Sequence, residues 1–257
     1  HKNHYEYAKR ALLSRKHVLC EKPMVLLKSQ ASELFDLAQK NNVIIQEAIK
    51  TAYAPAFNKL VNIAKSGIIG QIRDISATFT KLVENKTLRE FNKEMGGGSV
   101  TELATYPLCP IIKLLGTNYK NIYFNSIWDK DTGVDLYTKI NLEYDNAMAT
   151  ATVGIGVKKE GDLVIAGTKG YIYVEAPWWK TEYFEIRFEN SNYAKKVYIE
   201  FAGDGLRYEI ADFLKSVHNC RETYKLTPKE SIFINKVINA FRCDDDFNFE
   251  KELICIN

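Results

Sequence analysis

The sequence predicts two kinds of fold in succession. The first is the C-terminal half of a doubly wound parallel sheet (α/β), and the second is a large, open, mostly antiparallel sheet with helices on one face (α+β). Over residues 1–50, helix-like and strand-like segments alternate, which is the element order of a doubly wound parallel sheet. After residue 50, predicted strands dominate, and the run 134–142 alternates apolar and mostly polar residues, as is typical of antiparallel strands with one covered face.

The first four elements are short. Residues 5–16 predict an amphipathic helix, and the apolar run 17–20 predicts a strand. A second helix is expected over 29–40, with Ser29 as its N-cap. Residues 43–47 begin with three consecutive apolar residues and therefore predict a strand that is buried on both faces.

A series of strands follows a predicted helix at 54–66. Two helices are expected to close the chain at 206–219 and 228–242, the second opened by Thr227 as a cap. The predicted strands cover 72–82, 121–128, 134–144, 147–155, 162–166, 170–174, 183–188 and 196–201.

A further helical stretch is expected between the first two of these strands. It follows three glycines at 96–98 and ends at Leu115. Pro107 and Pro110 remove backbone donors within it, so we predict a kink or break just after Tyr106.

Composition excludes several classes of function. The chain of 257 residues is 46% hydrophobic, and 35 Lys and Arg against 32 Asp and Glu give a net charge of +3 without long basic runs. This balance argues against a nucleic-acid-binding protein, and no apolar run approaches the ~18–20 residues of a membrane span. We predict a cytoplasmic protein without a metal site, whose cysteines are buried thiols rather than a disulfide framework. The cysteines are Cys20, Cys109, Cys220, Cys243 and Cys255.

Five motifs recur in a fixed order along nearly the whole chain. They are Glu21-Lys22-Pro23, Ala-Lys-Ser-Gly-Ile-Ile-Gly at 64–70, Gly-Gly-Gly at 96–98 followed by Glu102 and Tyr106, Gly-Thr-Lys-Gly at 167–170, and Gly-Leu-x-Tyr-Glu-Ile at 205–210. In this order the chain resembles the glucose–fructose oxidoreductase and inositol dehydrogenase (Gfo/Idh/MocA) family, whose Rossmann strand ends in Glu-Lys-Pro. Residues 176–180 and Tyr106 look closer to its dihydrodiol and D-xylose dehydrogenase branch.

The resemblance implies a two-domain division. Residues 1–50 would be a partial dinucleotide-binding domain, and residues 51–257 a substrate-binding and oligomerisation domain. The sequence contains no glycine before Gly67, so the glycine-rich turn that cradles a dinucleotide is absent. A βαβ unit takes about 30 residues or more, which puts the absent first half at about 60–75 residues. We therefore expect an N-terminally truncated chain that is inactive as it stands.

The resemblance also implies an NAD(P)-dependent oxidoreductase with Lys22 as its catalytic lysine. Transfer of a hydride between nicotinamide and a CH–OH group requires the substrate oxygen to gain or lose a proton. Lys22 follows a parallel strand, at the edge where open α/β sheets bind ligands. Its ammonium would lower the pKa of the Tyr106 phenol, so that the two form a proton relay. A solvated lysine and an interdomain packing tyrosine are the structural alternatives.

The remaining candidates follow the same resemblance. Glu102 stands where the family usually has Asp; it is a substrate contact or a helix-surface carboxylate, and with Gly98 and Tyr106 it would share one helix face. Trp178 and Trp179 would line the substrate cleft or an oligomer face, or else pack in the core, and of the two we expect Trp178 to contact the substrate. Asn3, His4 and Glu21 are expected, with Lys22, to contact the cofactor.

We therefore expect NAD or NADP as cofactor and a sugar-like or vicinal-diol substrate. A homodimer or homotetramer through the open sheet is expected as the assembly. The alternative is a non-catalytic binding, assembly or ligand-sensing protein of the same fold, which the missing cradle favours and the intact Lys22–Tyr106 pair disfavours.

Overall fold

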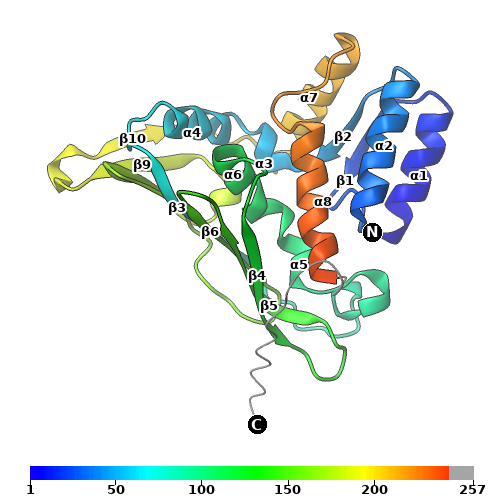
Figure 1. Ribbon diagram of the computed structural model, residues 1–257, viewed down its shortest axis with the longest axis horizontal. Helices are drawn as coiled ribbons and strands as arrows, with labels where there is room; N and C mark the ends of the chain where they lie inside the picture. Colours follow the sequence, from blue (N-terminus) through cyan, green and yellow to red (C-terminus); the bar gives the residue numbers. More distant parts are fainter. Residues whose placement is uncertain (243–257) are drawn as a thin grey trace.

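A computed structural model describes residues 1–242 of the chain (Figure 1). The first segment forms a small parallel sheet in which Val18 pairs with Ile45 and Glu21 with Ala48. Two helices pack beside this sheet and seal a small core around Leu12, Met24 and Leu34. The elements are α1 (Lys2–Leu13), β1 (Val18–Glu21), α2 (Lys28–Lys40) and β2 (Ile45–Ala48).

The second segment is dominated by one large open sheet. Its strand order is β10-β9-β8-β7-β3-β6-β5-β4, and every neighbouring pair is antiparallel except β3 with β6. The predicted mostly antiparallel sheet is confirmed. The strands are β3 (Ile72–Thr80), β4 (Asn121–Trp128), β5 (Asp135–Glu143), β6 (Met148–Gly154), β7 (Leu163–Gly167), β8 (Gly170–Val174), β9 (Tyr183–Phe188) and β10 (Lys195–Tyr198).

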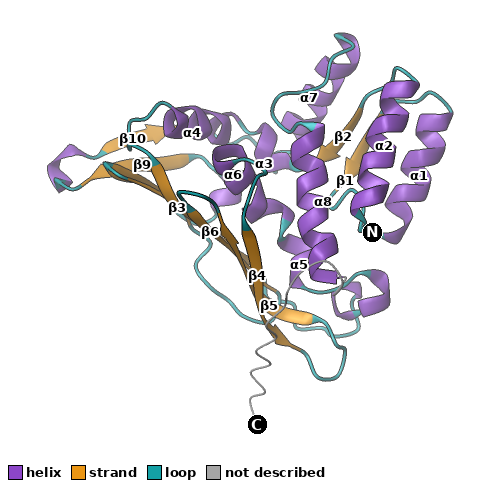
Figure 2. Ribbon diagram, viewed as in Figure 1, coloured by secondary structure: helices purple, strands orange, loops and turns teal. Residues whose placement is uncertain are grey.

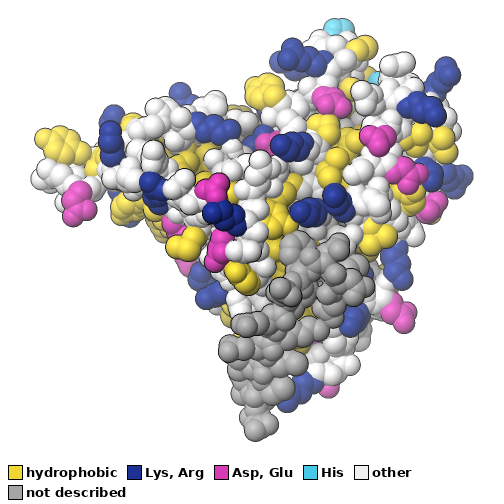
Figure 3. Space-filling view, viewed as in Figure 1, with side chains coloured by type: hydrophobic (Ala, Val, Ile, Leu, Met, Phe, Trp, Pro, Cys, Tyr) yellow, Lys and Arg dark blue, Asp and Glu magenta, His cyan; other side chains and the backbone are white. Residues whose placement is uncertain are grey.

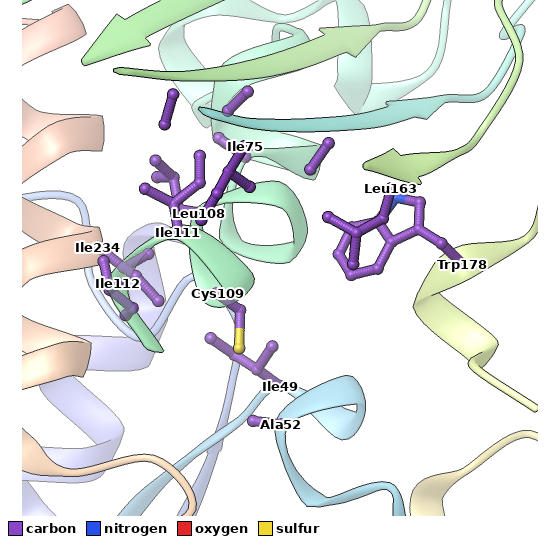
Figure 4. Close-up of a cluster of buried hydrophobic side chains, with 14 of the residues drawn as sticks. Ile49, Ala52, Ile75, Leu108, Cys109, Ile111, Ile112, Leu163, Trp178 and Ile234 are labelled. Carbon is purple, nitrogen blue, oxygen red and sulfur yellow. The ribbon is translucent and has the colours of Figure 1, made fainter. Parts of the chain in front are cut away.

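Within residues 1–242, helices cover one face of this sheet and leave the other face uncovered (Figure 2). The main core lies beneath them, where Leu108 and Ile111 lie beside Ile75 of the sheet, and Leu163 lies beside Trp178 (Figure 4). The helices are α3 (Lys50–Tyr53), α4 (Pro55–Lys65), α5 (Ser99–Leu103), α6 (Thr105–Leu115), α7 (Leu206–His218) and α8 (Pro228–Arg242), with short 3₁₀ turns at Arg89–Phe91, Lys93–Met95, Trp178–Lys180 and Ser191–Tyr193.

The last helix returns to the first segment and packs against α2 (Figure 1). The backbone N–H groups of Val25 and Lys28 donate to the side-chain oxygens of Asn235 and Asn239, at 3.1 and 3.0 Å. At the start of α8, the predicted cap is confirmed: the Thr227 N–H donates to Glu230, and the Glu230 N–H returns to the Thr227 hydroxyl.

These contacts also correct the expected cap of α2. The helix begins at Lys28 with Leu27 in the N-cap position, and no side chain of its own caps it. The Asn239 amide oxygen takes the place predicted for Ser29 by accepting the Lys28 N–H. A donor of the first helical turn is thus satisfied by a residue 211 positions away.

The predicted break after Tyr106 is wrong in position. The interruption falls at Ala104, between α5 and α6. Pro107 has no N–H that could donate to the Leu103 carbonyl, so α5 ends at Leu103. The proline then lies in the first turn of α6, where its missing N–H removes no hydrogen bond within that helix. Pro110 is accommodated inside α6.

The prediction that the cysteines are buried holds for two of them. Cys20 and Cys109 are buried, but Cys220 is exposed because it lies at the end of α7, beyond the core. Cys243 and Cys255 lie outside the described residues. Charges of both signs are interspersed over the face shown in Figure 3. Within residues 1–242, no helix combines the length and the apolar character that a bilayer crossing requires.

Gly98 makes room for a side chain of the protein itself, rather than for a ligand or the other domain. A Cβ at this position would lie 2.1 Å from Oδ1 of Asp135, and the backbone adopts φ 107° and ψ 157°. The Asp135 carboxylate accepts hydrogen bonds from the Ser99 hydroxyl at 2.5 Å and the Val100 N–H at 3.0 Å. A residue of β5 therefore caps and anchors the helix that carries Glu102.

Gly98→Ala should destabilise the protein more than Gly67→Ala. Gly67 also has a positive φ, of 80°, but an added Cβ there meets nothing within 4 Å. We expect Gly67→Ala to cost about 1–2 kcal/mol from backbone strain alone, and Gly98→Ala about 2–4 kcal/mol from strain and displacement of Asp135 together. Urea unfolding measures both, and equal losses would contradict the role given to Asp135.

Candidate functional site

Lys22 lies directly after β1, at the carboxyl edge of the small sheet. Its Nζ donates to the backbone carbonyl of Glu102 at 2.5 Å and lies 5.4 Å from the centroid of the Tyr106 ring. Burial lowers the pKa of Lys22, with the Glu102 carboxylate opposing this shift. The structure thus brings together the two residues that were predicted to move protons, although they are 84 positions apart.

Tyr106 belongs to a stacked group of three aromatic side chains. Its ring meets the Phe79 ring edge-on at 4.9 Å, and Phe79 stacks on Trp179 with 3.8 Å between ring centroids. Burial raises the pKa of Tyr106 to about 12, assisted by the carboxylates of Glu209 and Glu21. The expected lowering of the Tyr106 pKa by Lys22 is therefore wrong, because desolvation outweighs the nearby ammonium.

Glu102 is buried rather than on a helix surface. It is 6% exposed, and its carboxylate pairs with the His1 ring at 2.8 Å and the Arg89 guanidinium at 3.0 Å. Its backbone carbonyl holds Lys22. With both carboxylate oxygens engaged, Glu102 acts on the site through its backbone and through Arg89. The break at Ala104 places it on α5 and Tyr106 on α6, so the two do not share one continuous helix face.

The structure corrects the choice between the two adjacent tryptophans. Trp178 has no exposed surface, packs against Phe57 and donates its indole N–H to the Thr78 carbonyl at 2.7 Å. This places Trp178 in the core, where no substrate reaches it (Figure 4). Trp179 is half-buried and belongs to the aromatic group beside Tyr106. The backbone oxygen of Trp179 accepts the Thr51 hydroxyl at 2.6 Å, which ties this group to α3.

Of the three other residues predicted to contact the cofactor, His4 and Glu21 lie at the end of β1, and Asn3 lies on α1. The His4 ring hydrogen-bonds the Pro23 carbonyl at 2.9 Å, which fixes α1 against the Lys22 turn. Glu21 is exposed at the end of β1, and Asn3 is exposed on α1. Of the three, only His4 has a side-chain contact with this turn among the described residues, and a role in binding cofactor stays a prediction for all three.

Two buried carboxylates of the site were missed by sequence reasoning. Glu47 on β2 is 1% exposed, and Glu209 in the first turn of α7 is 3% exposed. Burial raises the pKa of each to about 7. For Glu47 a signal was available, because it ends the strand 43–47 that is predicted to be buried on both faces. For Glu209 the signal was weaker, since the motif at 205–210 contains this residue but gives no indication that its side chain is buried.

The described residues fit the nicotinamide end of a dinucleotide and not its phosphates. A buried ammonium, a phenol and an aromatic stack converge at the carboxyl edge of the β1–β2 sheet, where α/β folds bind such groups. The first glycine of the chain is Gly67, in the turn after α4. None of the residues 1–242 therefore supplies the glycine-rich strand–helix turn that holds a pyrophosphate.

Glu47 should make stability fall as the pH rises through the weakly acidic range. Its pKa is raised from 4.5 to about 7 in the folded chain, so between these values the folded state binds more protons than the unfolded state, and stability decreases with pH. The loss is at most about 3 kcal/mol. Glu47→Gln should flatten this slope in urea unfolding between pH 4.5 and 7. The exposed Glu84→Gln serves as a control, and an unchanged slope in Glu47→Gln would contradict the assignment.

Comparisons with known proteins identify relatives of both segments. Residues 1–49 match the family model described as "Oxidoreductase family, NAD-binding Rossmann fold", and residues 57–173 match the GFO/IDH/MocA C-terminal domain. Trans-1,2-dihydrobenzene-1,2-diol dehydrogenase of Danio rerio is 24% identical over 70% of this chain and 54% of its own length. A scyllo-inositol 2-dehydrogenase (NADP(+)) of Bacillus subtilis is 25% identical over 93% of this chain and 74% of its own.

Solved structures share the fold. A 3-ketoreductase from Actinomadura kijaniata in complex with NADP and TDP-benzene matches with a TM-score of 0.81 at 21% identity, over 93% of this chain and 74% of its own. An aldose-aldose oxidoreductase from Caulobacter crescentus complexed with glycerol has the same TM-score at 16% identity, over 93% and 72%. The chain spans about half the length of several curated relatives that it matches, at 53% and 54%.

Proposed function

We propose that this chain, which belongs to the Gfo/Idh/MocA family of oxidoreductases, takes part in NAD- or NADP-dependent hydride transfer at a CH–OH group of a sugar-like or vicinal-diol substrate. The observation that carries the proposal is the buried Lys22 ammonium, held on the Glu102 carbonyl and facing the Tyr106 ring. The names of the relatives support the substrate class, since they include a diol dehydrogenase and an inositol dehydrogenase.

The cofactor supplies or accepts the hydride, and the residues of this chain manage the proton. Lys22 is the residue that exchanges the proton with the substrate oxygen, because burial brings its pKa down towards the working range. Tyr106, whose pKa is about 12, stays protonated. It acts as a hydrogen-bond donor that positions and polarises the substrate oxygen.

The surroundings fix these two groups and limit the access of water. The Glu102 carbonyl directs the Lys22 ammonium, and the Phe79–Trp179 stack forms an apolar wall beside Tyr106. A preorganised cation in such a partly dry site stabilises charge that develops on the substrate oxygen better than water does.

Replacement of Lys22 and Tyr106 tests this assignment in the intact protein. Lys22→Ala should lower turnover of an accepted diol or sugar by about 10²–10⁴-fold, the usual contribution of a positioned acid–base group. Tyr106→Phe should lower it by about 10²-fold, because a single donor to the substrate oxygen is lost. The exposed Lys16→Ala is the matched control. If Lys22→Ala turns over the substrate as fast as the wild type, the catalytic proposal is wrong and the non-catalytic alternative is favoured.

We further propose that the bare sheet face is the assembly surface of a homodimer or homotetramer. A row of hydrogen-bonded polar side chains crosses this face. The Thr150 hydroxyl donates to the Asn141 amide oxygen, and the Asn141 amide nitrogen donates to the Asn125 amide oxygen, each at 3.0 Å. The Arg187 guanidinium lies 4.8 Å from the Tyr173 ring centre on the same face. Tyrosine and arginine are typical of protein interfaces.

A charge placed in the middle of this face should separate the subunits. Val164 of β7 is half-buried and pairs with Tyr173 of the neighbouring strand β8. Both residues lie on the uncovered face of the sheet. Val164→Lys should reduce the mass measured by light scattering to that of a monomer, because an unpaired buried charge opposes association. Ser191→Lys, in an exposed turn, is the control. A mass that stays oligomeric in Val164→Lys would place the interface elsewhere.

A further inference from the structure

Glu209 differs from the other buried carboxylates within residues 1–242 because its side chain has no hydrogen-bond or ion-pair partner among them. Five others are buried within residues 1–242, and each has a partner. Glu102 and Asp212 form ion pairs with Arg89 and Lys225. Glu47, Asp129 and Asp135 accept hydrogen bonds from Met24, Lys86 and Ser99, respectively. No hydrogen bond or ion pair from the described residues reaches the carboxylate of Glu209, and its Oε2 is fully buried.

A second buried acceptor lies against the same residue. Gln46 of β2 is 3% exposed, and its amide nitrogen donates to the backbone oxygen of Glu209 at 3.4 Å. Within the described chain, no donor reaches the amide oxygen of Gln46. Unpaired buried acceptors destabilise a protein, and two of them in contacting residues indicate a place where a ligand supplies the donors.

The position of Glu209 ties this pair to the reaction site. Its carboxylate raises the pKa of Tyr106 and is itself influenced by Glu21 at the end of β1 and by Lys50 of α3. Its helix, α7, packs against α3, which also holds Trp179 through the Thr51 hydroxyl. Glu209 therefore lies close enough to Tyr106 to influence its ionisation, and its helix is linked through α3 to Trp179.

We propose that Glu209 and Gln46 form a hydroxyl-binding subsite, in which their free oxygens accept hydrogen bonds from substrate hydroxyl groups adjacent to the reacting carbon. This inference rests on the proposed function and deepens it, because it restricts the substrate to compounds with at least one hydroxyl besides the one that reacts. Two acceptor oxygens match the hydroxyl donors of a neutral polyol, and they would repel a phosphate or carboxylate group placed against them.

A direct binding measurement tests the subsite without turnover. Intact protein with saturating NADP⁺ is titrated calorimetrically with myo-inositol, D-xylose and trans-cyclohexane-1,2-diol, and cyclohexanol serves as the analogue without a second hydroxyl. Glu209→Gln should weaken binding of each polyol that the wild type binds by about tenfold, since a charge-assisted acceptor becomes a neutral one. Gln46→Met should weaken the same polyols, and cyclohexanol should be unaffected by either change.

Thermal unfolding separates a binding role from a structural one. Glutamine matches glutamate in size and removes the repulsion from Glu21, so Glu209→Gln should melt at the same temperature as the wild type or higher. Asp212→Asn is the matched control on the same helix: it breaks the 2.9 Å pair with Lys225, so it should melt lower and bind polyols normally.

Four results would overturn the inference. These are unchanged polyol affinity in Glu209→Gln, a melting temperature for Glu209→Gln as low as that of Asp212→Asn, weakened binding of NADP⁺ instead of the polyol, and no binding of any polyol by the wild type. Failure of the proposed function is distinguishable. Polyol binding could depend on Glu209 while turnover is unchanged by Lys22→Ala. That result would support the subsite and contradict the catalytic role of Lys22.

Discussion

The geometry of the site depends on the buried carboxylate of Glu47. It accepts the Met24 N–H at 2.8 Å, two residues after Lys22, and hydrogen bonds from Ser231 and Asn235 of α8. The Glu47 carbonyl accepts the Tyr53 hydroxyl at 2.8 Å. One residue of β2 thus links the turn that carries Lys22, the last helix and the start of the second segment. A carboxylate buried this deeply is tolerated only because several donors satisfy it.

A second buried carboxylate fixes the opposite side of the site. Asp135 of β5 reaches the N-terminus of α5 through the gap that Gly98 leaves. Helix α5 in turn presents the Glu102 carbonyl to Lys22. Lys22 is therefore positioned from both segments, by Glu47 through the following turn and by Asp135 through α5. This dual support explains how a long, flexible side chain is held against one carbonyl at the boundary between them.

Sequence patterns correctly predicted the features of the fold that depend on residues close together in the chain. The bounds predicted for β4, β8 and β9 are correct, and the Glu-Lys-Pro and triple-glycine motifs identified Lys22 and Tyr106, which lie at one site. Distant contacts decided the rest. The cap of α2 comes from Asn239, and the burial of Trp178 rather than Trp179 depends on a turn that ends at Lys180. The Tyr106 pKa depends on desolvation, which a sequence does not display.

Desolvation shifts the ionisable groups of the site in opposite directions. It lowers the pKa of the Lys22 ammonium and raises those of Glu209, to about 7, and Tyr106, to about 12. The pKa values of Lys22 and Glu209 therefore move towards each other, whereas the pKa of Tyr106 moves further above neutral pH. Proton transfer is most efficient between groups of matched acidity. In the proposed mechanism, this burial would leave Tyr106 as a hydrogen-bond donor that stays protonated, and Lys22 as the group that exchanges a proton with the substrate oxygen.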